Sequence, residues 1–235
     1  MTKYALVILT SENNIGFKLA ALDTYLKHVP DNMDIYFIYG GNISNVIPCK
    51  RAGISYTDIY IKTPDSISNL HKKLFGFFRK IVNKDYTHAL KIDDDTFLYN
   101  VDTFLEHKIS GDYVGNKVLI TNEEVVRTKL CTLKNYKIRK AYKGELPNQY
   151  CSGECVIFSK KAIQTIVSYK GKEKYEKFSL EDVVIGNILQ KSDIKINPNK
   201  FLNYEHPVEI RKFFNLYDKH YTKINEGFMR DCTQT

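Results

Sequence analysis

Uninterrupted apolar runs alternate with amphipathic stretches along the first part of the chain. The run at residues 4–10 (YALVILT) is rich in β-branched residues, and a second run at 33–39 (MDIYFIY) is followed by two glycines. Runs of this kind predict strands that are buried on both faces, as in a parallel sheet. Between them, apolar positions at 17–26 recur at helical spacing. This strand–helix–strand opening predicts a parallel, Rossmann-like sheet.

The same alternation continues to the end of the chain. Residues 55–61 and 88–92 predict two more strands, and residues 68–82 predict a long helix with an apolar inner face and lysines and arginines opposite. No repeat, linker or low-complexity segment divides the chain, so we expect a single α/β domain over residues 1–235. The other expected elements are a short helix near 100–105, strands at 113–115, 118–121 and 156–158, and helices at 160–169, 183–190 and 209–219.

Composition narrows the classes of protein that fit this pattern. Hydrophobic residues make up 43% of the chain, which is enough for a sizeable core. No apolar stretch reaches the roughly 20 residues of a membrane span, and the first run lacks the cleavage site of a signal peptide. Five cysteines, an odd number, argue against a fully paired disulfide framework and fit a reducing compartment. Cys151 and Cys155 have no second Cys/His pair at zinc spacing, which argues against structural zinc.

The net charge of +8 comes from 35 basic against 27 acidic residues. A basic chain suggests an anionic partner such as nucleic acid, a membrane surface or nucleotide phosphates. The lysines are spread along the chain, however, which argues against nucleic acid. Much of the positive charge is concentrated in residues 122–149. This irregular segment fits a loop over a ligand crevice, an acceptor-binding element or a plain surface loop.

Three consecutive carboxylates, Asp93, Asp94 and Asp95, follow the expected strand at 88–92. Adjacent like charges repel each other, so the triplet requires a compensating cation unless water solvates it. The carboxyl ends of strands in an open α/β sheet also form its ligand crevice. The triplet therefore predicts a divalent-metal site that serves a phosphorylated ligand, and the alternative is a solvated acidic turn.

Two later segments carry further candidate chemistry. Gly153 lies in a stretch of small residues before the expected strand at 156–158, where the backbone can approach a ligand closely. Glu181 and Asp182 open the helix that continues over 183–190. Acidic residues favour helix N-termini in any case, so capping is the alternative explanation for this pair.

Taken together and in this order, four segments resemble the β-1,3-galactosyltransferase and fringe-like glycosyltransferase family. His206 follows them, and the resemblance covers about residues 66–215. It implies the GT-A fold, a Rossmann-like mixed β-sheet flanked by helices, and it favours the metal site over the solvated turn. The four segments are residues 70–77 (LHKKLFGF), 86–97 (YTHALKIDDDTF), 150–153 (YCSG) and 180–186 (LEDVVIG).

The resemblance implies a metal-dependent, inverting transfer of a hexose (galactose, N-acetylglucosamine or glucose) from a UDP-sugar to a hydroxyl group of a glycan or glycoprotein. Mn²⁺ is the implied cofactor and Mg²⁺ the alternative, because carboxylates with one imidazole suit these ions. The nucleotide-binding part would cover about residues 1–120, and the acceptor-binding and catalytic part about residues 121–235. The sugar, the acceptor and the oligomeric state stay open.

The family pattern also assigns roles to individual residues. Asp182, the second acidic residue of Leu-Glu-Asp-Val, would be the base that deprotonates the acceptor hydroxyl. The metal ligands would be Asp93, Asp95 and His206, with His220 as the alternative histidine. The residues expected to bind the nucleotide-sugar donor are Thr10, Ser11, Lys73, Asp93, Asp94, Gly153 and Glu181.

The chain departs from the family pattern in three respects. Glu154 stands where the family often has consecutive glycines after Cys-Ser-Gly, which would alter the donor or acceptor pocket. The sequence shows neither the membrane anchor nor the stem of eukaryotic members. We therefore expect a minimal, soluble, cytoplasmic form, as in a bacterial or large-virus enzyme, or a cut-out catalytic domain. The N-terminal third matches the family only at the level of the fold.

Two other classes of function stay open at this point. A phosphoryl or nucleotidyl transferase with two metals would use the same aspartates. It would need a second group of carboxylates, for which Glu181 and Asp182 are available. A non-catalytic module that binds sugar or nucleic acid would fit the charge of +8. Such a module would bind in a salt-sensitive manner without needing a metal.

Overall fold

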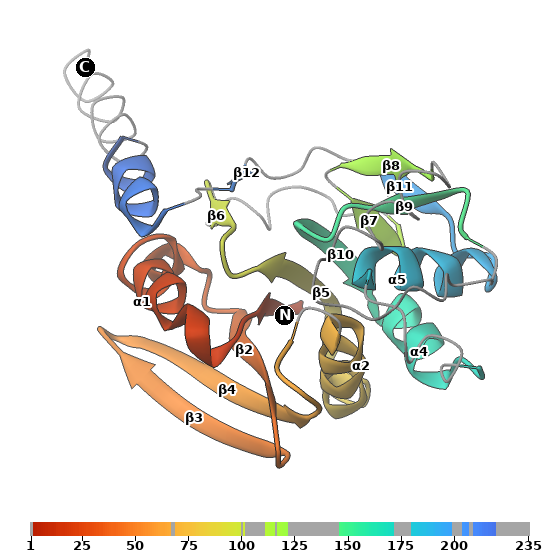
Figure 1. Cartoon of the computed structure of the whole chain (residues 1–235), viewed down its shortest axis with the longest axis horizontal. Helices are drawn as coiled ribbons and strands as arrows, with labels where there is room; N and C mark the ends of the chain where they lie inside the picture. Colours follow the sequence, from red (N-terminus) through yellow and green to blue (C-terminus); the bar gives the residue numbers. More distant parts are fainter. Residues whose placement is uncertain are drawn as a thin grey trace.

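A computed structural model shows a mixed α/β fold built on one eight-stranded sheet with helices packed on it (Figure 1). The strand order is β11-β7-β10-β5-β1-β2-β4-β3, and the pairs β12-β6 and β8-β9 form two short ribbons. The residues that the structure describes are 2–66, 69–99, 101, 111–115, 117–121, 146–171, 180–198, 204–206 and 209–219.

Every strand that the hydrophobic pattern predicts is present. The strands are β1 (Lys3–Leu9), β2 (Met33–Gly41), β3 (Asn45–Arg51), β4 (Ile54–Lys62), β5 (Tyr86–Asp93), β6 (Phe97–Leu98), β7 (Tyr113–Gly115), β8 (Val118–Ile120), β9 (Gln149–Cys151), β10 (Cys155–Ser159), β11 (Ile196–Pro198) and β12 (Tyr204–Glu205). The helices are α1 (Ile15–Asp23), α2 (Leu70–Ile81), α4 (Lys160–Ser168) and α5 (Glu181–Gln190), with the 3₁₀ helices η1 (Glu12–Asn14) and η2 (Tyr25–His28). A C-terminal helix is described over residues 210–219.

The centre of the sheet is parallel, as the apolar runs predict. β1 lies between β2 and β5 and is parallel to both, and β2 is parallel to β4. β10 is antiparallel to β5, with Cys155 opposite Ile92, and β3 is antiparallel to β4. Because parallel strands end at one edge, the carboxyl ends of β1, β2, β4 and β5 meet there. The turn that enters β10 reaches the same edge.

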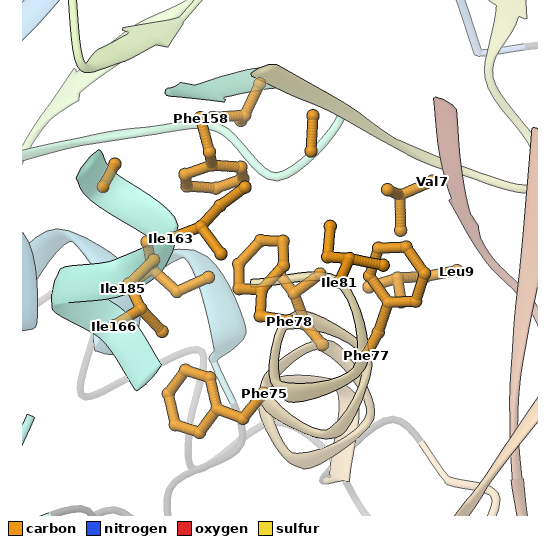
Figure 2. Packing of buried hydrophobic residues seen from close by; sticks show 14 of the residues in the cluster. Val7, Leu9, Phe75, Phe77, Phe78, Ile81, Phe158, Ile163, Ile166 and Ile185 are labelled. Carbon is orange, nitrogen blue, oxygen red and sulfur yellow. The ribbon is translucent and has the colours of Figure 1, made fainter. Parts of the chain in front are cut away.

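Successive residues of β1 point into two separate cores. Ala5, Val7 and Leu9 pack with α2, α4 and α5, whereas Leu6 and Ile8 pack with α1 and the C-terminal helix. Figure 2 shows the first core, where side chains of α2 lie between Val7 and Leu9 of β1 and the side chains of β10 and α4, among them Phe158 and Ile163. Burying each such side chain contributes about 1.5–3 kcal/mol, so a strand covered on both faces is held firmly.

Several elements differ from the expectation, and the short strands β6, β9, β11 and β12 were not predicted. β3 is an edge strand that contains Pro48 and is mostly exposed, so it lacks the apolar run that marks the other strands. The helix expected over 17–26 ends at Asp23, because Thr24 leaves the helical region (φ −122°, ψ −112°) and η2 follows. α2 covers Leu70–Ile81, so it begins two residues later and ends one residue earlier than the helix expected over 68–82.

Two expectations fall largely on residues that the structure does not describe, namely the short helix near 100–105 and the basic segment at 122–149. Among the described residues, Cys49, Cys151 and Cys155 are free thiols. Within the described ranges, no helix is both long enough and apolar enough to cross a membrane.

Candidate active site

The acidic triplet lies where β5 leaves the sheet. Asp93 is the last residue of β5, and the N–H of Asp94 donates to the carbonyl of Leu9 at the end of β1 (3.1 Å). A turn follows, in which the N–H of Thr96 donates to the carbonyl of Asp93 (3.1 Å). Asp94 is buried, whereas the side chain of Asp95 is 48% exposed. The three carboxylates therefore share one edge of the sheet but differ in their access to a ligand.

Asp94 is bound to the segment that follows β1. Its Oδ2 accepts hydrogen bonds from Oγ1 of Thr10 (2.7 Å) and Nδ2 of Asn14 (3.0 Å). Burial raises the pKa of Asp94 to about 6, although these two hydrogen bonds oppose the shift. Ser11 begins the turn into η1, and its carbonyl accepts the N–H of Asn14 (2.9 Å). Thr10, Ser11 and Asp94 thus lie together, and their expected binding of the donor stays a prediction.

Asp94→Asn should make the stability of the protein less dependent on pH. Because the pKa is raised from 3.8 to about 6, the folded state holds this proton more firmly than the unfolded chain does. Ionisation of Asp94 therefore weakens the fold as the pH rises from about 4 to about 6, and its full effect persists above that range. The variant should gain on the order of 2 kcal/mol relative to the wild type over this range. Urea unfolding near pH 4 and near pH 7 measures the difference, and an equal difference at both would contradict the prediction.

Lys73 of α2 is buried and ties several chain segments together. Its Nζ donates to the carbonyl of Thr10 (2.7 Å) and to Oδ1 of Asp65 (2.6 Å). Asp65, which follows β4, also accepts the backbone N–H groups of Gly40 and Glu12 (3.2 Å each). The expected contact of Lys73 with the donor stays a prediction, and in this structure its ammonium is paired with Asp65. Asp65 was not predicted from the sequence, where its only signal is its place just after an expected strand.

One buried ammonium joins three of the segments that resemble the family. Lys91 of β5 is only 1% exposed, and its Nζ donates to Oδ1 of Asp93 (2.7 Å), the carbonyl of Gly153 (2.5 Å) and Oε2 of Glu181 (3.2 Å). Burial alone would lower the pKa of Lys91, but the two carboxylates outweigh burial and raise it. Lys91 was not predicted as a site residue from the sequence. The available signal was a lysine inside an otherwise apolar strand, where a charge requires a buried partner.

Glu181 and Asp182 form the first turn of α5 and differ in their surroundings. Glu181 is buried, and burial raises its pKa to about 7 despite the nearby Lys91. Asp182 is partly exposed, and its Oδ1 accepts the N–H of Val183 (2.8 Å). A Cβ on Gly153 would lie 3.1 Å from Oε2 of Glu181 and 3.7 Å from Cβ of Asp182, so a glycine permits this close approach. The structure therefore places this turn beside the acidic triplet.

His206 lies between two carboxylates. Its Nδ1 is 3.4 Å from Oδ1 of Asp95, and its Nε2 is 3.5 Å from Oε2 of Glu154. The interactions with Asp95 and then Glu154 raise the pKa of His206 to about 10, and His206 in turn lowers the pKa of Glu154 to about 2. The β12–β6 ribbon brings His206 here, because Tyr204 pairs with Leu98 just after the triplet. Glu154, noted in the sequence only as a departure from the family, is thus part of the cluster.

The donor atoms of this cluster suit part of a metal site. Asp95 and His206 present an oxygen and a nitrogen 3.4 Å apart, close to the separation of about 3 Å between neighbouring ligands of an octahedral ion. Asp93, the third expected ligand, directs Oδ1 to Lys91, and His220 falls outside the described residues. No three His, Cys, Asp or Glu side chains of the described ranges form a complete metal site. The pair therefore fits an ion whose other ligands come from phosphates and water.

Comparison with known proteins shows a family and a fold. The Galactosyltransferase family model matches residues 25–200. Core-mannan synthase A from Aspergillus fumigatus, in its Mn/GDP form, matches with a TM-score of 0.50 and 12% identity over 88% of this chain and 75% of that one. The catalytic domain of Drosophila β1,4-galactosyltransferase 7, in complex with xylobiose, matches with a TM-score of 0.44 and 11% identity over 89% of this chain and 72% of that one. Comparison with curated proteins gave no match.

The family match covers all four segments that carry the resemblance seen in the sequence, from the start of α2 to the start of α5. At 12% identity, the likeness to the fungal synthase bears on the fold alone, and it agrees with the mixed sheet and its flanking helices. Because the family model spans well over half of the chain, the protein belongs to the galactosyltransferase family and is a nucleotide-sugar glycosyltransferase with the GT-A fold.

Proposed function

We propose that this enzyme transfers a hexose from a UDP-sugar to a hydroxyl group of a glycan or glycoprotein, with inversion at the anomeric carbon and with Mn²⁺ or Mg²⁺ as cofactor. Galactose, N-acetylglucosamine and glucose are the candidate sugars. The main support is the pairing of Asp95 with His206 at the carboxyl edge of the sheet. At the same edge, Lys91 forms ion pairs with Asp93 and Glu181. The donor would bind within about residues 1–120 and the acceptor within about residues 121–235.

The first task of the site is to stabilise the leaving group. Departure of UDP gathers negative charge on the diphosphate, and a bound divalent cation would offset that charge. Asp95 and His206 would hold the ion, since their donor atoms face each other at 3.4 Å. Thr10 and Asp94, which are hydrogen-bonded to each other, would form the nucleotide side of the site.

The second task is to activate the acceptor. A sugar hydroxyl is a poor nucleophile until a base removes its proton in the transition state. We assign this role to Asp182, because it is the partly exposed carboxylate at the start of α5. Its neighbour Glu181 is buried against Lys91 and would instead position the turn.

Thermal unfolding with and without ligands tests this proposal. A ligand that binds only the folded state stabilises it by about 2.7 kcal/mol at a concentration of about 100 times Kd. UDP and Mn²⁺ together should raise the melting temperature much more than either alone, because the ion would bridge the protein and the diphosphate. A panel of UDP-sugars measured in the same way should identify the donor.

Asp95→Ala should remove most of the Mn²⁺-dependent gain in melting temperature. Asp31→Ala is the control, because it removes an exposed carboxylate just before β2, at the opposite edge of the sheet. No gain with any nucleotide would contradict the proposed function. An unchanged Mn²⁺-dependent gain in Asp95→Ala would show that the metal binds elsewhere.

A further inference from the structure

Glu154 lies in the turn that connects β9 with β10. β10 is antiparallel to β5, with Cys155 opposite Ile92, so this turn lies beside the acidic triplet. Oγ1 of Thr96, just after the triplet, donates to the carbonyl of Glu154 (3.3 Å).

The side chain of Glu154 contacts the segment that carries His206. Its Oε2 accepts a hydrogen bond from the hydroxyl of Tyr204 (2.7 Å) and lies 3.5 Å from Nε2 of His206. The rings of Tyr204 and His206 meet edge to face, with their centroids 5.7 Å apart. On the other side of the imidazole, Nδ1 faces Asp95 at 3.4 Å. One carboxylate oxygen therefore accepts the Tyr204 hydroxyl and lies beside the buried Nε2 of His206, which makes no hydrogen bond among the residues that the structure describes.

We propose that Glu154 is a positioning residue of the metal site, which holds the His206 ring so that Nδ1 faces the ion beside Asp95 while Nε2–H points to Glu154. The inference rests on the proposed function, specifically on Asp95 and His206 as ligands. Histidine ligands generally donate their second N–H to a carboxylate, a carbonyl or water. The negative charge of Glu154 also increases the attraction for a divalent cation. A glycine at this position would supply neither effect.

The affinity for Mn²⁺ in the presence of UDP, measured from the EPR signal of free Mn²⁺, tests this role directly. Loss of such a partner typically lowers metal affinity by about 10- to 100-fold. We expect a Kd about 10-fold higher in Glu154→Gln, which keeps the size and an acceptor oxygen, and a larger increase in Glu154→Gly.

Two further measurements separate positioning from a general structural effect. In the Mg²⁺- and UDP-loaded protein, the NMR signal of the His206 Nε2–H proton should show the downfield shift of a hydrogen bond in the wild type and lose that shift in Glu154→Gly. The melting temperature without metal shows whether each variant folds. Glu209→Gln, at an exposed position before the C-terminal helix, is the control for the loss of one negative charge.

The outcomes distinguish this inference from the proposed function. Wild-type Mn²⁺ affinity in both Glu154 variants would overturn the positioning role and leave the proposed function intact. A loss in Glu154→Gln as complete as that in Asp95→Ala would make Glu154 a ligand, which also overturns it. If the wild type itself binds no Mn²⁺ in the presence of UDP, the metal-dependent function and the role of Glu154 both fail.

Discussion

Asp182→Asn should lower the rate of sugar transfer by about 10²- to 10⁴-fold, the usual contribution of a general base. The amide keeps the size of the side chain, and its oxygen can still accept the N–H of Val183 as the carboxylate does (2.8 Å). It cannot, however, take the proton of the acceptor hydroxyl. Binding of UDP and Mn²⁺ should be nearly unchanged, because Asp182 is not among the residues expected to hold the donor or the metal.

Initial rates of transfer and the melting-temperature gain with UDP and Mn²⁺ separate these two effects. Asp193→Asn is a matched control, because it makes the same change at an exposed position just after α5. The backbone of Asp193 has φ 57°, which asparagine adopts readily, so this variant should transfer sugar normally. Full activity in Asp182→Asn would refute its role as the base. Loss of both nucleotide binding and transfer would show that Asp182 maintains the structure of the site and would not support its role as the base.

The central sheet could be predicted from the sequence because its strands are buried on both faces. The runs at 4–10 and 33–39 became β1 and β2, the first of which supplies side chains to both cores. β3 could not be predicted in this way. It is an edge strand whose exposed sequence includes Pro48, and its antiparallel pairing with β4 supplies the stability that a buried apolar run supplies elsewhere.

The candidate site also has a part that could be predicted from the sequence and a part that could not. The acidic triplet stands out in the sequence because consecutive like charges follow an apolar strand. Lys91 does not stand out, because its partner Glu181 is 90 positions away and nothing in a single sequence shows which carboxylate will reach a buried lysine. Lys73 shows the same limit, since a helix position expected on the polar face is buried against Asp65. Long-range ion pairs of this kind follow from the topology and not from local pattern.

The structure also bears on the phosphoryl-transfer alternative that the sequence left open. That chemistry would require Glu181 and Asp182 as a second group of metal-binding carboxylates. Glu181 is instead buried and paired with Lys91. The family match favours sugar transfer independently of this geometry.

Lys91→Met should destabilise the protein by about 3–5 kcal/mol, as expected when one partner of a buried ion pair is removed. Methionine fills a similar volume, but Asp93 and Glu181 lose their counter-charge and the carbonyl of Gly153 loses a donor. The pKa of Glu181, already raised to about 7, should rise further without the ammonium. A carboxyl group whose pKa is raised in the folded state weakens the fold once the pH exceeds its unfolded pKa. The loss should therefore be larger near pH 8 than near pH 5.

Urea unfolding of the wild type, Lys91→Met, Glu181→Gln and the double variant measures the coupling between the two residues. The double variant should be more stable than Lys91→Met, because a neutral amide replaces the unbalanced carboxylate. Lys80→Met, at an exposed position of α2, should change stability by less than about 0.5 kcal/mol. Equal stability of Lys91→Met and Lys80→Met would refute the ion pair.

The same ammonium also orients Asp93 and the Gly153 turn, so sugar transfer should stay low in the double variant even where stability recovers. That combination would show that Lys91 holds the site in its working geometry as well as stabilising the fold.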